Sequence, residues 1–257
     1  MKDSRQSRYE PYKILNDFSL FDLECVRLIL RGGSVLDWRK FSPTADEIKA
    51  FCRVHQLDLE DPDHLALVDR IRDEAVVYLR ETLSFPVPRP MRQASLAELL
   101  AMAGNGASRH RQLCACTLLK AMHVINHFDA GEARQALKVT DQDLFFTAEQ
   151  LIYRTISGMM AHQMPVVEFM GGRKQRASMV TKLLSKEDPL SAQLFDKMRF
   201  RIVTATSDDI LPTINFLTRT LFPFNYVLSG ESYNTLFPFL SYCEGNKNLA
   251  KLSKQLQ

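Results

Sequence analysis

The sequence of 257 residues lacks any long apolar run. No stretch approaches the roughly 18 consecutive apolar residues that a membrane-spanning helix needs, so we expect no membrane partner. Residues 1–13 mix basic and acidic side chains and have no apolar centre, which is not the pattern of a signal peptide. We expect these residues to form a solvated tail, and the cysteine content described below favours a cytoplasmic protein.

Neither sign of charge dominates. The chain has 33 Lys and Arg against 30 Asp and Glu, for a net charge of +3. This small excess does not indicate nucleic acid or a membrane surface as a partner. Hydrophobic residues make up 46% and charged residues 25%, which is ordinary for a globular protein long enough for two modest domains.

Motifs that bind zinc or form disulfides are also missing. The five cysteines are scattered and odd in number, and Cys114-Ala-Cys116 lacks the two-residue gap of a zinc or redox pair. We expect them to be reduced and to pack as small core residues. His123 and His127 are four apart, but Val124 stands where a His-Glu-x-x-His motif needs Glu, so a structural or capping role is favoured.

The apolar spacing changes along the chain. Up to Met160 it is typical of helices, and after Pro165 short runs rich in β-branched and aromatic residues predict strands. Helices are expected at 20–30, from Thr44 or Ser42, from Pro62, at 95–102, 109–127, 141–160, 177–184, 208–221 and in the tail 244–257, and strands at 166–170, 200–204 and 224–228, with a turn at 230–234.

The order strand–helix–strand–helix–strand predicts a sheet flanked by helices, of the α+β or the α/β class. We assign the chain to the α+β class. A helical N-terminal domain is expected at residues 1–164, and a domain with a small sheet at residues 165–257. The boundary is placed near residues 161–165.

A basic segment follows the first predicted strand. Gly171 and Gly172 precede Arg173, Lys174 and Arg176. Cations at a junction between a strand and a helix, beside glycines that let the backbone approach a ligand, suit a polyphosphate. The spacing is not that of a P-loop, and a solvated basic loop is the alternative interpretation.

The second predicted strand carries both signs of charge. Asp196 stands just before it and could bind Mg²⁺ together with substrate phosphates, or it could be an ion-pair residue. Arg199 and Arg201 are two apart and therefore share one face of the strand. Two cations on one face of a half-buried strand need acidic or phosphate partners.

Together these segments resemble the synthetase domain of the RelA/SpoT family, which makes guanosine alarmones on a nucleotidyltransferase-like fold. Ser178-Met179-Val180-Thr181-Lys182-Leu183 fits the family's Ser-Ile-x-x-Lys-Leu/Met helix. The residues from Asp196 to Val203 match its Asp-x-x-x-x-Arg-Ile-Val strand, and 225–227 and 232–236 are similar to later motifs in degenerate form. The resemblance covers roughly residues 165–240 and suggests a bacterial branch with its own helical N-terminal region.

The resemblance implies transfer of the β,γ-pyrophosphoryl group of ATP to the 3′-hydroxyl of GDP or GTP with Mg²⁺. By the same resemblance, Asp196 binds the metal, Arg201 supports the site, and Tyr226 or Tyr233 stacks on guanine. The nucleotide-binding residues implied are Arg173, whose offset from Ser178 differs by one residue from the family's, together with Lys174, Arg176, Ser178 and Lys182.

One family motif is missing. No Glu-x-Gln-x-Arg pattern, which supplies a second carboxylate, occurs after Leu240. Either the chain is truncated relative to its relatives or the site lacks that carboxylate. An open sheet edge would result, to be covered by a partner chain or a second copy. Three functions stay open: a pyrophosphokinase, a nucleotide-binding regulatory module without catalysis, and a helical interaction module.

Overall fold

The computed structural model describes residues 12–33, 36–105, 108–136, 141–184, 198–222 and 234–256. Backbone contacts divide the chain into two compact units, which are described separately. The first unit comprises Met1–Val139 and Ile214–Gln257, and the second comprises Thr140–Thr213. The second unit is therefore an insertion in the sequence of the first.

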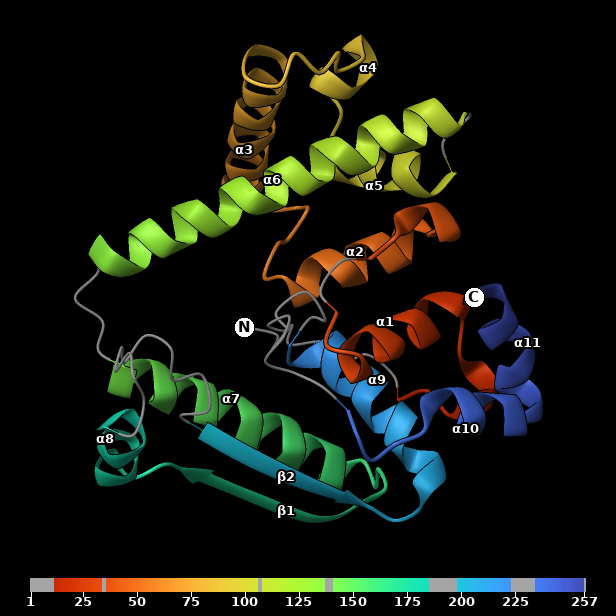
Figure 1. Ribbon diagram of the computed structural model, residues 1–257, viewed down its shortest axis with the longest axis vertical. Coiled ribbons are helices and arrows are strands. Elements are labelled where there is room, and N and C mark those ends of the chain that lie inside the picture. Colours follow the sequence, from red (N-terminus) through yellow and green to blue (C-terminus); the bar gives the residue numbers. More distant parts are fainter. Residues whose placement is uncertain are drawn as a thin grey trace, which may run out of the picture. The chain divides into compact units, whose positions relative to one another are not determined.

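The described elements are mostly helices (Figure 1). None of the described helices is long and apolar enough to cross a membrane. In chain order the elements are η1 (Leu15–Asp17), α1 (Leu20–Leu30), η2 (Trp38–Lys40), α2 (Ala45–Val54), α3 (Pro62–Glu81), α4 (Arg89–Arg92), α5 (Leu96–Asn105), α6 (Arg109–Ala136), α7 (Asp141–Ala161), β1 (Val166–Arg173), α8 (Arg176–Leu184), β2 (Met198–Thr204), η4 (Ser207–Asp209), α9 (Ile210–Thr220), α10 (Phe239–Gly245) and α11 (Lys247–Leu256).

Local capping signals fix where the first helices begin. Thr44 caps α2, where it forms a capping box with Glu47. At the start of α3, Asp61 accepts hydrogen bonds from two backbone N–H groups, and Pro62 occupies the first turn. These side chains satisfy donors that the helix itself cannot pair. The predicted starts of both helices are confirmed.

The core of the first unit forms around the single tryptophan. The Trp38 ring lies 5.0 Å from the Phe51 ring and 5.7 Å from the Phe21 ring, measured between centroids. The five cysteines are unpaired, and four of them are buried. Burial raises the pKa of the Cys52 thiol to about 12, so this thiol remains protonated and packs as an apolar group. The expectation that most of the cysteines pack in the core is confirmed.

A buried carboxylate joins distant parts of the first unit. Asp22 in α1 has no exposed side-chain surface, and it accepts hydrogen bonds from Lys13 Nζ at 2.7 Å and from Arg219 Nη1 of α9 at 2.6 Å. The backbone N–H and the hydroxyl of Ser19 also donate to Asp22. Two cations thus share one carboxylate that could not be buried alone.

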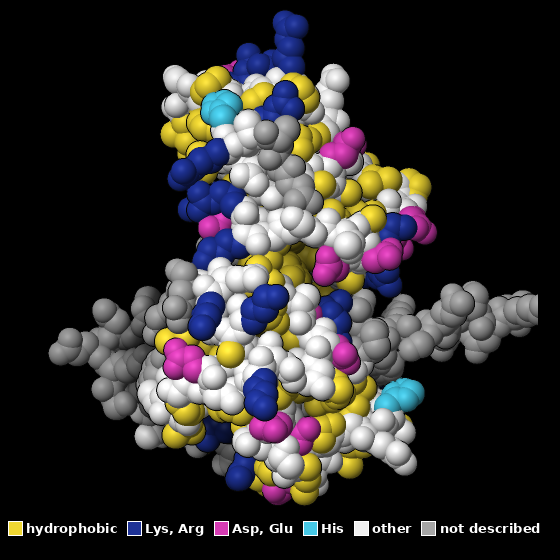
Figure 2. All heavy atoms as spheres, turned by 90° about the vertical axis from the view of Figure 1, so that its right-hand side faces the viewer, with side chains coloured by type: hydrophobic (Ala, Val, Ile, Leu, Met, Phe, Trp, Pro, Cys, Tyr) yellow, Lys and Arg dark blue, Asp and Glu magenta, His cyan; other side chains and the backbone are white. Residues whose placement is uncertain are grey.

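The C-terminal helix α11 is amphipathic. Leu249, Ser253 and Leu256 are buried, while the lysines of the opposite face are exposed. Figure 2 views the molecule from the side of α10 and α11, where Lys and Arg side chains are spread among apolar and uncharged ones. The expected helix in the tail is confirmed as α11, although it begins at Lys247 and Glu244 belongs to α10. One face of α11 belongs to the core.

The second unit contains α7, β1, α8 and β2, together with η4. β1 and β2 pair antiparallel and form a two-stranded sheet within the described residues, which agrees with the α+β class. β1 continues through Gly171 and Gly172 to Arg173, so the expectation that it ends at the glycines is wrong. The predicted strand 224–228 lies outside the described residues, as does most of the turn 230–234. The division of the chain into domains 1–164 and 165–257 remains a prediction. The two compact units defined by backbone contacts have different boundaries.

We predict that the variant Asp22→Asn lowers the free energy of unfolding by about 3–5 kcal/mol, because two partly buried cations lose the buried carboxylate that they share. Urea unfolding followed by circular dichroism measures the change. The matched control is Asp37→Asn in the exposed pair with Arg39, with an expected loss of at most about 1 kcal/mol. Equal losses in the two variants would contradict the role of Asp22.

The same network predicts how stability depends on pH. Burial raises the pKa of the Asp22 carboxyl, but the hydrogen bonds from Lys13 and Ser19 and the charge of Arg219 outweigh burial and hold the pKa below its usual value. A lowered folded pKa stabilises the protein above the unfolded value of about 3.9, and this stabilisation is lost as pH falls through the folded pKa. Between about pH 5 and pH 2, the urea midpoint should therefore fall more steeply for the natural protein than for Asp22→Asn.

Candidate functional site

The pairing of β1 with β2 brings two predicted motifs to one end of the sheet. Arg173, the last residue of β1, lies opposite Met198, the first residue of β2. Gly172 lies opposite Arg199, and Met170 lies opposite Arg201. The basic end of β1 therefore meets the start of the strand that follows Asp196 in sequence.

One face of this sheet packs against α7. The Phe169 and Phe200 rings stack with centroids 6.0 Å apart, and Tyr153 of α7 meets Phe169 edge-on at 5.4 Å. Gly171 lies in this layer, and a Cβ on it would come within 2.8 Å of the Phe200 ring and 3.1 Å of the Tyr153 hydroxyl. Glycine at this position is what lets the aromatic layer close.

Arg173 lies on the same face as this layer. Its Nε and Nη2 donate to the two carboxylate oxygens of Glu149 in α7, at 2.5 and 2.6 Å, and its guanidinium is 6.0 Å from the centre of the Phe145 ring. The hydrogen bond from Arg173 lowers the pKa of Glu149, and the same bond raises the pKa of Arg173. A nucleotide contact by Arg173 stays a prediction, and it would require this two-pronged pair to open.

The opposite face of the sheet carries Arg199 and Arg201. Both side chains are exposed, and none of the described carboxylates forms an ion pair with either. Side chains alternate along a strand, so these arginines point away from the layer that contains Phe200. The prediction that they share one face is confirmed. Arg173 and Arg201 consequently lie on opposite faces of the sheet.

The other predicted site residues are described only in part. Lys174 is half-buried just after β1, and Ser178 is exposed in α8, which confirms the expected helix. Arg176 and Lys182 lie in α8, but their side chains are outside the described part of the structure. Asp196, Tyr226 and Tyr233 lie outside the described residues altogether. Their roles remain predictions.

No cluster of metal ligands is present among the described residues. Since Asp196 is not among these residues, the expected Mg²⁺ site stays a prediction. His123 and His127 are exposed on α6, with ring centroids 4.4 Å apart. Partial burial of its ring, followed by the charges of His127 and His55, lowers the pKa of His123. Asp129, which follows the pair in sequence, is held by Arg70 at 2.8 Å.

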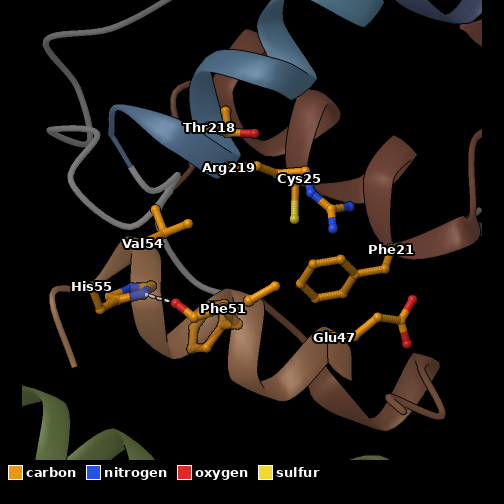
Figure 3. Close-up of a pocket in the computed structure, with 9 residues that line it drawn as sticks. Phe21, Cys25, Glu47, Phe51, Val54, His55, Thr218 and Arg219 are labelled. Carbon is orange, nitrogen blue, oxygen red and sulfur yellow. Dashed lines mark hydrogen bonds between the residues drawn. The ribbon is translucent and has the colours of Figure 1, made fainter. Parts of the chain in front are cut away.

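The first unit contains a pocket between α1, α2 and α9 (Figure 3). Phe21, Phe51 and Val54 give it an apolar wall, and Arg219 lies at its side. The space is about 410 Å³, much of it open to solvent. Arg219 is already hydrogen-bonded to Asp22, and none of the predicted site residues lines this pocket. We therefore take the sheet of the second unit as the candidate site.

Comparison with known proteins finds no match: no family model, no curated protein and no solved structure matches the chain.

Three residues of α7 that organise the site were not predicted from the sequence. Phe145, Glu149 and Tyr153 are spaced four apart, which places them on one helical face, and all three contact the sheet or Arg173. This spacing was the available signal. It could not indicate which strand residues the helix would meet, because that depends on the pairing of β1 with β2.

We predict opposite outcomes for alanine at the two neighbouring glycines. Gly171→Ala should destabilise the protein by about 1–3 kcal/mol, because the Phe200 ring must move. Gly172→Ala should be neutral or stabilising by up to about 1 kcal/mol, because nothing lies within 4 Å of the added Cβ. Thermal unfolding of both variants measures the difference. Similar losses would refute the assignment of the two faces.

Proposed function

We propose that the protein is a nucleotide pyrophosphokinase that transfers the β,γ-pyrophosphoryl group of ATP to the 3′-hydroxyl of a guanosine nucleotide. The observation that carries this proposal is the antiparallel pairing of β1 with β2. It brings the basic end of β1 beside the first residue of β2, two positions after Asp196 in sequence. Cations and a carboxylate from separate motifs are what a nucleotide phosphate site requires.

In this reaction the 3′-hydroxyl oxygen forms a bond to the β-phosphorus of ATP. The bond between that phosphorus and the oxygen bridging it to the α-phosphorus breaks, the hydroxyl proton is released, and AMP leaves. Catalysis of such a transfer depends on positioning and on neutralising phosphate charge. Lys174 and Lys182 would bind the phosphates, and Ser178 and Arg176 would support them.

The residue types present fit a magnesium ion. Mg²⁺ in nucleotide sites is bound by one or two carboxylates, and phosphates and water complete its coordination shell. Asp196 would supply the carboxylate, and the substrate would supply the phosphates. When bound, the ion neutralises charge on the phosphates. Arg201 would support the phosphate chain from β2, and Tyr226 or Tyr233 would stack on the guanine base.

The test is incubation of the full chain with labelled ATP, Mg²⁺ and GDP or GTP, followed by chromatography of the products. We expect a pyrophosphorylated guanosine nucleotide and AMP, and a loss of turnover of about a hundredfold or more in Asp196→Asn. The control is Glu81→Gln, an exposed carboxylate in α3 of the first unit, which should keep full turnover.

Two results would contradict this function. ATP binding without any product would exclude the kinase and favour the regulatory module, which the absent Glu-x-Gln-x-Arg motif and the engaged Arg173 also favour. Absence of both binding and product would exclude both nucleotide functions. Glu244→Gln adds a check on the second carboxylate, since a loss of turnover in this variant would assign that role to the tail.

A further inference from the structure

The face of the sheet that points away from α7 has a composition of its own. It carries Arg199 and Arg201 from β2, with Gly172 and Met170 directly opposite them on β1. We call these four residues the two-arginine face. Glu168 is next to Met170 on the same face of β1, and it forms no ion pair with either of these two arginines. Both arginines are exposed, and Met170 is 46% exposed.

The two guanidinium groups are set apart by the geometry of the strand. Residues two apart on a strand are about 6.6 Å from each other, and arginine side chains are long enough to converge on one anion from that distance. Their like charges repel unless an anion lies between them. Arg173 has such a partner in Glu149, whereas the described carboxylates supply none to Arg199 or Arg201.

Gly172 leaves the backbone beside Arg199 uncovered. A Cβ at this position would find no atom within 4 Å, so packing does not require glycine here, in contrast to Gly171. The missing side chain lets an anion approach both the main chain and the guanidinium of Arg199. A bare strand residue opposite an arginine that has no acidic partner within the described part of the chain is therefore suited to close contact with phosphate oxygens.

We propose that Arg199 binds the phosphate chain of the nucleotide, together with Arg201 and across the bare backbone of Gly172. Arg173 is hydrogen-bonded to Glu149 on the other face and does not bind the phosphate chain in this proposal. That the phosphate chain belongs to a nucleotide rests on the proposed function. That the two-arginine face binds a linear polyphosphate does not depend on the proposed function.

Titration calorimetry with inorganic tripolyphosphate and with ATP tests the proposal on the full chain. Arg199→Gln should weaken the binding of both ligands by about 10–100-fold, since it removes a two-pronged charged contact. Arg199→Lys should recover only part of the affinity, because an ammonium cannot form the paired hydrogen bonds of a guanidinium. Arg80→Gln, an exposed arginine of the first unit, is the control with the same charge change and should bind normally.

Two further variants separate a specific contact from general attraction. Gly172→Val keeps every charge and covers the backbone, so it should weaken tripolyphosphate binding severalfold without lowering the midpoint of thermal unfolding. Arg173→Gln should retain tripolyphosphate affinity. Circular dichroism of each variant verifies the fold.

The outcomes distinguish this inference from the proposed function. Normal binding by Arg199→Gln overturns the inference, and it leaves the function intact if Asp196→Asn still abolishes transfer. Equal losses in Arg199→Gln and Arg80→Gln, or a loss in Arg173→Gln alone, also overturn it. Tripolyphosphate binding that depends on Arg199, without pyrophosphate transfer, supports the inference while the proposed function fails.

Discussion

The register between β1 and β2 decides what the candidate site can contain. Side chains alternate along each strand, so a slip by one residue would exchange the two faces of the sheet. In the observed register, Gly171 closes the aromatic layer beneath α7, and Gly172 is left bare on the other side. The same register commits Arg173 to Glu149 and turns Arg199 and Arg201 outward. The pairing of β1 with β2 therefore determines which basic residues lie on the same face and can bind one ligand.

Much of the secondary structure follows from local chemistry and was predictable. The start of α2 depends on Thr44 and Glu47, which are three residues apart, and the start of α3 depends on Asp61 and Pro62. The roles of the basic residues were not predictable in this way. Glu149 and Arg173 are separated by 24 positions, and no local pattern links them. A run of cations in the sequence therefore indicated a site without showing that its members would divide between two faces.

The contrast between Arg173 and Arg199 illustrates why the amount of charge is a poor guide to binding. A guanidinium held by both oxygens of a carboxylate has used its planar edge, and a phosphate must compete with that carboxylate for it. When an exposed guanidinium binds a ligand, the main unfavourable contribution is the loss of side-chain conformational entropy. The same holds for Arg219, which lines the pocket in the first unit. A ligand in that pocket would have to compete with Asp22 for the guanidinium of Arg219.

The ion pair between Asp22 and Arg219 also has a consequence for how the chain folds. Its partners are 197 positions apart, and the whole second unit is encoded between them. Loop-closure entropy rises slowly with length, by about 0.6 kcal/mol for each doubling, so the equilibrium cost of this separation is modest. The kinetic cost is larger, because long-range contacts form late. During synthesis, the ion pair between α1 and α9 cannot form until α9 has been made. The inserted second unit can therefore collapse before the chain of the first unit is complete.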